Sequence, residues 1–187
     1  MPSLDDNELL ERARRLDQQA LGEIHDRFYS EVFRYVRYRL AQEQLCEDIT
    51  SEVFLRFLNA LNRKQGPTTN LRGWLIGTAS HMVNDHLRGK YRRTMENIDH
   101  TEEHLLVDDQ LPEDLINADQ ENQAVREAFN ELTAEQQHVL ALRFGQELSL
   151  EETAQIVGKT ITAVKALQFR ALASLRRILE KNKIEQP

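Results

Sequence analysis

The chain has 187 residues, of which 40% are hydrophobic and 29% are charged, a length for one ordinary domain or two small ones and a composition typical of globular proteins. No apolar run approaches the roughly 18 residues of a membrane span, and the N-terminus lacks the basic start and apolar middle of a signal peptide. Cys46 is the only cysteine, which excludes an internal disulfide and a thiolate cluster for zinc. We therefore expect a cytoplasmic protein with no membrane insertion and no cofactor.

The net charge of −7 is distributed unevenly along the chain. Residues 94–125 carry ten carboxylates and no Lys or Arg, so this segment contributes −10 and the rest of the chain sums to +3. The segments 62–93 and 159–183 each hold seven basic residues against a single acidic one. Either segment alone fits a solvated helix face, but two of them separated by an acidic spacer favour an anionic ligand such as nucleic acid.

Four helices are predicted in the first part of the chain. Asp5 and Asp6 are suited to cap a first helix that ends near Leu16. The second is expected over Ala20–Leu40, where one stripe turns to the core: Ile24, Phe28, Val32, Val36 and Leu40. The third is expected over Cys46–Leu61 and buries six apolar residues: Ile49, Val53, Phe54, Phe57, Leu58 and Leu61. Its opposite face carries a spare stripe at helical spacing: Asp48, Ser51, Glu52, Leu55 and Asn59.

A loop over residues 62–70, broken by Gly66 and Pro67, leads to a fourth helix that contains Trp74, the only tryptophan. The core arc of this helix is complete without Trp74 and consists of Leu71, Leu75, Ile76, Ala79, Met82, Val83 and Leu87. The indole lies in a row with Gly77, His81, Asn84 and Arg88. Two interpretations are open: the indole stacks on an unpaired base while the loop encloses it, or the indole packs under the loop.

Residues 94–114 are acidic and weakly periodic, and we expect an extended flexible linker. His100 and His104 have a spacing that suits helical metal ligands, but without a third strong ligand they are expected to be ordinary solvated residues. The first helix of a second domain is indicated by Leu115, Ala118, Val125, Ala128, Phe129 and Leu132. Capping boxes at Thr133 and Ser149 begin the next two helices, and Gly145 and Gly158 are placed to end them in left-handed caps.

The segment LEETAQIVGKTITAVKALQF has the spacing of a helix-turn-helix. Ala154 permits a close crossing, Gly158 permits a positive φ in the turn, and Val164 faces inward. Along the second helix one side is apolar: Val164, Leu167, Ala171, Leu172, Leu175 and Ile178. The outer side is small, polar or basic apart from one aromatic residue, and it suits the major groove of DNA: Thr162, Lys165, Ala166, Phe169, Ala173 and Arg176, flanked by Arg170 and Arg177. A solvated amphipathic helix is the alternative.

Three segments together resemble the extracytoplasmic-function (group four) sigma factors of bacterial RNA polymerase: CEDITSEVFLRFLNAL, then LRGWLIGTASHMVNDHLRGKYRR, then LTAEQQHVLALRFGQELSLEETAQIVGKTITAVKALQFRALASLRRIL. The resemblance covers nearly the whole chain in the family's order. It implies an all-α fold with sigma domain two in residues 1–93, an acidic linker in 94–114, and sigma domain four with its helix-turn-helix in 115–187. It departs from the family at His81 or Met82, where many members have Asn, and at Thr162–Leu167, where many have Gly-Thr-Val-Lys-Ser-Arg.

The resemblance implies partners and site residues. Core RNA polymerase would bind through its β′ clamp helices and its β flap, with the clamp helices on Asp48, Ser51, Glu52, Leu55 and Asn59. The minus-ten promoter element would meet Lys64, Thr68, Thr69, Asn70, Trp74, His81, Asn84, Arg88, Arg92 and Arg93. The minus-thirty-five element would meet Thr162, Lys165, Ala166, Phe169, Arg170 and Arg176. An anti-sigma factor is expected to cover these surfaces.

Two other functions compete with that of a promoter-specificity subunit. An autonomous helix-turn-helix regulator with a helical sensor domain would bind an operator without polymerase. An enzyme is disfavoured because the sequence has no convergent carboxylate pair, phosphate-binding glycine loop or nucleophile–base set. The sequence leaves the promoter consensus and the regulon open.

Overall fold

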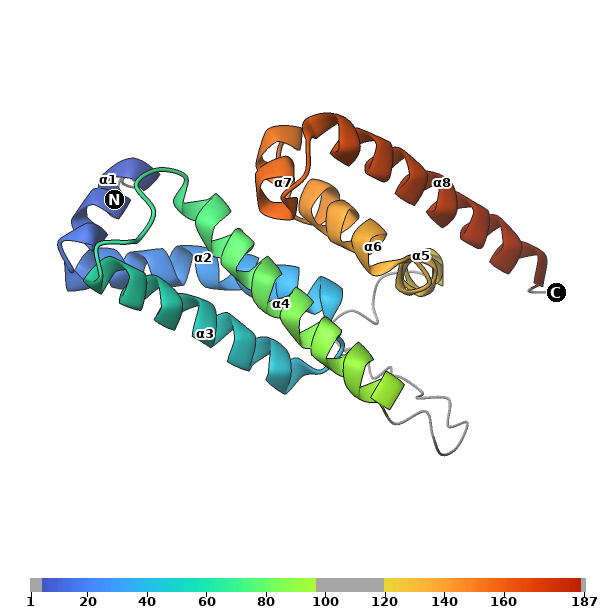
Figure 1. Cartoon of the computed structure of the whole chain (residues 1–187), viewed down its shortest axis with the longest axis horizontal. Helices are drawn as coiled ribbons and strands as arrows, with labels where there is room; N and C mark the ends of the chain where they lie inside the picture. The colour runs from blue at the N-terminus through green and yellow to red at the C-terminus, as the bar shows by residue number, and fades with distance from the viewer. Residues whose placement is uncertain (1–4, 97–119, 186–187) are drawn as a thin grey trace. The chain divides into compact units, whose positions relative to one another are not determined.

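The computed structural model describes residues 5–96 and 120–185, and every regular element within these two ranges is a helix (Figure 1). The chain divides into two compact units, Met1–Asp108 and Asp109–Pro187. The predicted all-α fold is therefore confirmed. The predicted linker begins at residue 94, but the fourth helix continues to Glu96. The remainder of that linker, together with His100, His104, Leu115 and Ala118, lies outside the described residues.

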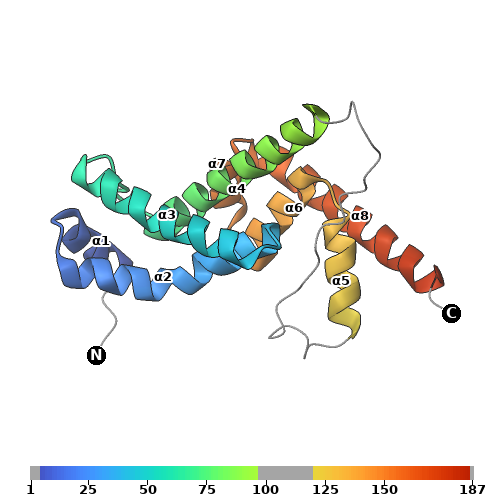
Figure 2. The same cartoon turned by 90° about the horizontal axis from the view of Figure 1, so that it is seen from below.

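The first unit contains α1 (Asp6–Arg14), α2 (Gln18–Arg39), α3 (Glu43–Asn62) and α4 (Leu71–Glu96). Helices α2, α3 and α4 pack against one another, and α1 contacts all three (Figures 1 and 2). Helix α2 begins two residues earlier than predicted because Asp17 caps it: its Oδ1 accepts from the backbone N–H groups of Gln19 at 3.0 Å and Ala20 at 3.2 Å. Asp5 stands at the N-cap of α1 but makes no side-chain cap hydrogen bond.

The core of the first unit follows most of the predicted stripes, but Leu58 is exposed, and Phe54, Met82 and Leu87 are only partly buried. Every residue of the predicted α2 stripe is buried, and Ile49, Val53, Phe57 and Leu61 of α3 are buried with it. Leu58 was expected in the core but is 37% exposed, because it lies about 100° around α3 from the buried Phe57. Phe54 is partly buried, and its ring lies 4.9 Å from that of His25 and 6.1 Å from that of Tyr29 on α2.

The second unit contains α5 (Gln120–Asn130), α6 (Ala134–Leu140), a π-helical turn η2 (Ala141–Gly145), α7 (Leu150–Val157) and α8 (Ile161–Glu185). Helices α5, α6 and α7 all pack on α8, and α5 runs across the direction of α8 in Figure 2. Ala128 and Leu132 are buried as expected, whereas Val125 is 44% exposed because α5 presents only one face to α8. The core of this unit therefore lies along the inner side of α8.

Both predicted capping boxes are present in the second unit. Thr133 Oγ1 accepts from the Gln136 N–H at 3.3 Å, and Ser149 Oγ accepts from the Glu152 N–H at 3.1 Å, with the reciprocal side-chain bonds made in each case. Gly158 ends α7 in a left-handed conformation, as predicted, with φ of 68°. The prediction for Gly145 is wrong. Gly145 belongs to the π-helical turn, and the chain reverses two residues later at Glu147, which has φ of 53°.

Candidate nucleic-acid interface

The helix-turn-helix of α7 and α8 has the geometry that its sequence spacing predicts. Ala154 on α7 and Val164 and Leu167 on α8 are buried in one cluster with Val139 of α6. The left-handed Gly158 turns the chain between the helices, and the Lys159 N–H donates to the Ala154 carbonyl at 3.1 Å. Thr160 then opens α8 by accepting from the Ala163 N–H at 3.2 Å. The inner residues of α8 therefore hold the helix in place and leave its other side to solvent.

The outer side of α8 is exposed along its length. Phe169 is 75% exposed, a large fraction for an aromatic side chain. The other predicted contact residues are also exposed: Thr162, Lys165, Ala166, Arg170 and Arg176. Arg176 donates to Glu180 at 2.9 Å in an ion pair one turn along the helix. Leu172 was placed on the inner side but is 40% exposed, so the apolar stripe is narrower than predicted.

Trp74 is partly buried and lies against α3. Its ring centroid is 5.6 Å from that of Phe57, with the two planes tilted by 58°. The indole rests on a core aromatic of α3 and keeps part of its surface open, so the choice between base stacking and packing under the loop stays a prediction. The packing partner is an α3 side chain, which the helical projection of α4 alone did not identify.

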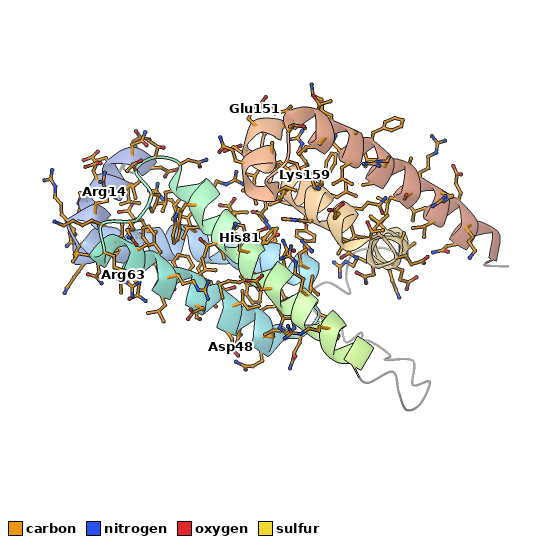
Figure 3. All side chains as sticks on the ribbon, in the orientation of Figure 1. Arg14, Asp48, Arg63, His81, Glu151 and Lys159 are labelled. Carbon is orange, nitrogen blue, oxygen red and sulfur yellow. The ribbon has the colours of Figure 1, made fainter. Side chains whose placement is uncertain are left out.

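The predicted row on α4 contains both exposed and partly buried side chains. His81 and Arg88 are exposed, and Figure 3 labels His81 on α4. Asn84 is partly buried, and its Oδ1 accepts from the Arg39 guanidinium of α2 at 3.2 Å. Arg39 is only 7% exposed, and within the described residues its Nε has no hydrogen-bond partner. Burial lowers the pKa of Arg39 and raises the pKa of Tyr35 beside it. The amide of Asn84 therefore has a structural partner, which the sequence analysis missed.

The loop between α3 and α4 has an exposed polar surface over a buried proline. Lys64, Thr68 and Thr69 are exposed, and Pro67 is buried. Asn70 caps the start of α4, because its Oδ1 accepts from the Gly73 N–H at 2.9 Å. A Cβ on Gly73 would lie 2.4 Å from the Nδ2 of Asn70. The pattern Asn-Leu-Arg-Gly was the available signal for this cap.

Two basic residues at the end of α4 complete the predicted minus-ten set. Arg92 is exposed, and the side chain of Arg93 lies outside the described ones.

Among described helices, none is long and apolar enough for a bilayer crossing, and no group of His, Cys, Asp and Glu among described residues is suited to hold a metal ion.

The spare stripe on α3 faces solvent as predicted. Asp48, Ser51 and Asn59 are exposed, and Leu55 is 51% exposed (Figure 3 labels Asp48). Glu52 is partly buried and accepts from Arg56 at 3.0 Å. With Leu55 and Leu58 both open to solvent, α3 presents an apolar strip bordered by polar groups. Such a strip is typical of a protein-binding surface.

Comparison with known proteins defines the class of the molecule. Residues 24–93 match the family model of Sigma-70 region 2, and residues 128–177 match that of Sigma-70, region 4. The chain is 36% identical over 176 residues to the ECF RNA polymerase sigma factor BldN of Streptomyces coelicolor, covering 92% of this chain and 65% of BldN. It is 32% identical over 164 residues to the ECF RNA polymerase sigma factor SigD of Mycobacterium tuberculosis, covering 86% of this chain and 77% of SigD.

A solved structure shares the fold. The sigma factor RpoE of Bartonella quintana, solved in complex with the anti-sigma factor NepR, gives a TM-score of 0.68 at 18% identity, over 85% of this chain and 96% of that one. The two matched regions, in this order, define a sigma-70-type initiation factor. The chain belongs to the extracytoplasmic-function family of RNA polymerase sigma factors. Proteins of this class are alternative sigma factors that serve transcription initiation and are normally non-enzymatic, and the autonomous-regulator alternative is not favoured.

Proposed function

We propose that this chain joins core RNA polymerase in the cytoplasm, directs it to a promoter by reading the minus-thirty-five and minus-ten elements, and has no catalytic activity of its own. The observation that carries the proposal is the exposed outer side of α8, with its inner side held by the core. Lys165 and Arg170 have the length and charge to reach guanine edges or phosphates, and Phe169 has the surface to touch a thymine methyl. Thr162, Ala166 and Arg176 complete this minus-thirty-five face.

The minus-ten element is assigned to the loop before α4 and to the exposed side of that helix. Lys64, Thr68 and Thr69 offer a cation and two hydroxyls to a displaced strand, and the partly open indole of Trp74 offers a stacking surface. His81, Arg88 and Arg92 extend the basic side, and Arg93 is included because it follows Arg92 in the sequence. Asn70 and Asn84 support this surface through the cap of α4 and the bond to Arg39. Binding energy from these contacts would favour the melted DNA over the duplex.

Core polymerase is assigned to the α3 strip of Asp48, Ser51, Glu52, Leu55 and Asn59, through the β′ clamp helices, and to the second unit through the β flap. The relative from Bartonella quintana was solved with an anti-sigma factor. We propose that an anti-sigma factor holds this chain inactive by covering its partner surfaces. The exposed Leu55 is suited to either protein partner because an open leucine gains from burial in any well-fitted interface.

In-vitro transcription with purified core polymerase tests the proposal. A promoter library is transcribed with core polymerase alone and with this chain added, and a promoter-dependent transcript is expected only in the second reaction. The same chain is footprinted on duplex DNA without polymerase. A footprint on a palindrome by the free chain, with no promoter-dependent transcript, would establish the autonomous regulator instead.

A further inference from the structure

A hollow lies between α1 and the loop that follows α3. Its volume is about 260 Å³, and it is lined by Glu11, Arg14, Arg15, Leu61, Lys64 and Gly66. Figure 3 labels Arg14 on α1 and Arg63 at the end of α3, at this end of the first unit. The volume is below the roughly 300–1,000 Å³ of sites for drug-sized ligands, so it suits a small group. None of the α1 residues was among the predicted DNA contacts.

The charge of this hollow is positive. Three of its lining residues are cations and one is a carboxylate. Glu11 is already engaged with Arg14 at 3.1 Å. Arg15 and Lys64 have no ion-pair partner in the part of the chain that the structure describes. With Glu11 paired to Arg14, the charges of Arg15 and Lys64 leave the hollow with a net positive charge, and an anion placed there would be stabilised by both.

The backbone positions Lys64 at this site in an unfavourable conformation. Helix α3 ends with the Gln65 N–H donating to the Ala60 carbonyl at 2.8 Å and the Lys64 N–H donating to the Leu61 carbonyl at 2.9 Å. This is the Schellman arrangement, in which the residue at the Lys64 position is usually glycine. Lys64 instead adopts φ of 56° with a long side chain. Leu16 ends α1 in the same arrangement with φ of 60°, so the charge of the Lys64 side chain, and not the backbone cost, distinguishes this position.

We propose that this hollow binds a backbone phosphate of single-stranded DNA, and that α1 thereby acts with the loop in holding the melted strand. The inference rests on the proposed function, in which the loop before α4 faces that strand. Arg15 and Lys64 supply the charge, and Gly66 leaves the wall without a side chain; a Cβ there would lie 2.6 Å from Leu61 Cδ2. The contact is sequence-independent because every nucleotide carries the same phosphate.

The test measures binding of a dye-labelled, mixed-sequence single strand to the full-length protein over a salt series. The variants are Arg15→Gln and Lys64→Gly. The second removes the cation and gives the left-handed position the residue that adopts it most readily, so its thermal midpoint should equal or exceed that of the wild type. Each variant should weaken binding and reduce the slope of log affinity against log salt by about 0.7, the value for one phosphate that is no longer neutralised on a single strand. Arg34→Gln, an exposed arginine on α2, is the control for loss of charge alone and should keep the wild-type slope.

The proposal is overturned if both Arg15→Gln and Lys64→Gly keep the salt slope of the unmodified protein. It is also overturned if the unmodified protein does not bind the strand at low salt. A second arm adds inorganic phosphate or GTP at constant ionic strength. If these raise the thermal midpoint of the wild type but not of Lys64→Gly, while the strand-binding slopes stay unchanged, the hollow belongs to a free phosphate compound and the DNA assignment is overturned. Failure of the proposed function has a different signature, which is the absence of promoter-dependent transcripts from the wild-type chain.

Discussion

At the scale of one residue, Trp74 has a packing role in the structure and a proposed role in binding DNA. Its ring rests on Phe57 at 5.6 Å and is only partly buried. A fully buried indole contributes to the stability of the fold through its whole surface, whereas the Trp74 indole leaves part of its face open to a partner. The position therefore carries a moderate structural role together with the proposed stacking role.

The variant Trp74→Ala separates the two roles. We expect the free energy of unfolding to fall by about 2 kcal/mol, less than for a fully buried aromatic side chain, because only part of the ring is packed. Unfolding in urea followed by far-ultraviolet circular dichroism measures this without the tryptophan signal. Open-complex formation, measured by permanganate reactivity of unpaired thymines, should decrease by more than the loss of folding stability explains. Trp74→Phe keeps a ring beside Phe57 and should restore stability. A decrease of about 4 kcal/mol or more with no specific defect in opening would make Trp74 a core residue only.

At the scale of the element, the start of α2 depends on one carboxylate. Asp17 accepts from the Ala20 N–H, which is the main cause of its lowered pKa, and it also pairs with Arg12 at 2.9 Å. Since the folded state holds the pKa below the ordinary value of 3.8, the stabilisation is present above that value and is lost as the pH falls through the folded pKa.

Asp17→Asn tests this dependence because it keeps the cap and removes the charge. The thermal midpoint of the variant should lie below that of the wild type at neutral pH, and the gap should close as the pH falls below 3.8. Asp17→Ala, which also removes the cap, should be less stable than Asp17→Asn at every pH. A gap that stays constant down to the acid limit would show that the charge of Asp17 does not stabilise α2.

The turn of the helix-turn-helix depends on the backbone freedom of Gly158. Gly158 has φ of 68°, and no atom lies within 4 Å of where a Cβ would be, so the position disfavours other residues through backbone strain and not through a clash. Gly158→Ala should therefore lower the free energy of unfolding by about 1–2 kcal/mol, and Gly158→Asn by less. Gly22→Ala is the matched control, because Gly22 has equally open space but lies inside α2, where alanine should raise stability. Equal effects at the two positions, in thermal or urea unfolding, would contradict the strain argument.

At the scale of the whole molecule, the proposal assigns promoter reading and polymerase binding to different helices. Lys165→Ala and Arg170→Ala should weaken minus-thirty-five binding by about 1–3 kcal/mol for each base that the protein no longer reads, and they should leave the affinity for core polymerase unchanged. Leu55→Glu should weaken holoenzyme assembly, because it places a charge in an apolar contact, without altering promoter choice by the holoenzyme that still forms. Competition binding to core polymerase and footprinting of assembled holoenzyme measure the two properties separately. A fall in core affinity for the α8 variants would contradict this division.

The sequence by itself determined the features that depend on neighbours along the chain. Capping boxes at Thr133 and Ser149, the left-handed Gly158 and the apolar stripe of α2 follow from local geometry and the helical period, and the structure has them. The apolar stripe of α8 is present but narrower than predicted, because Leu172 is 40% exposed. The outer side of α8 and the spare stripe of α3 were also predictable, because an exposed face is what remains once the core face is assigned. The same reasoning predicted the all-α fold with its two units.

Tertiary structure decided whatever depends on residues distant in sequence. Leu58 stays exposed beside the buried Phe57 and Leu61, Asn84 has a partner 45 residues away in Arg39, and Trp74 packs on Phe57. Gly145 does not form the expected cap because α6 continues into a π-helical turn, which the glycine position alone does not reveal. The hollow between α1 and Lys64 exists only because two helix ends meet in space. A helical projection fixes which side of one helix a residue occupies, but the neighbouring helix determines whether that side is packed, paired or open.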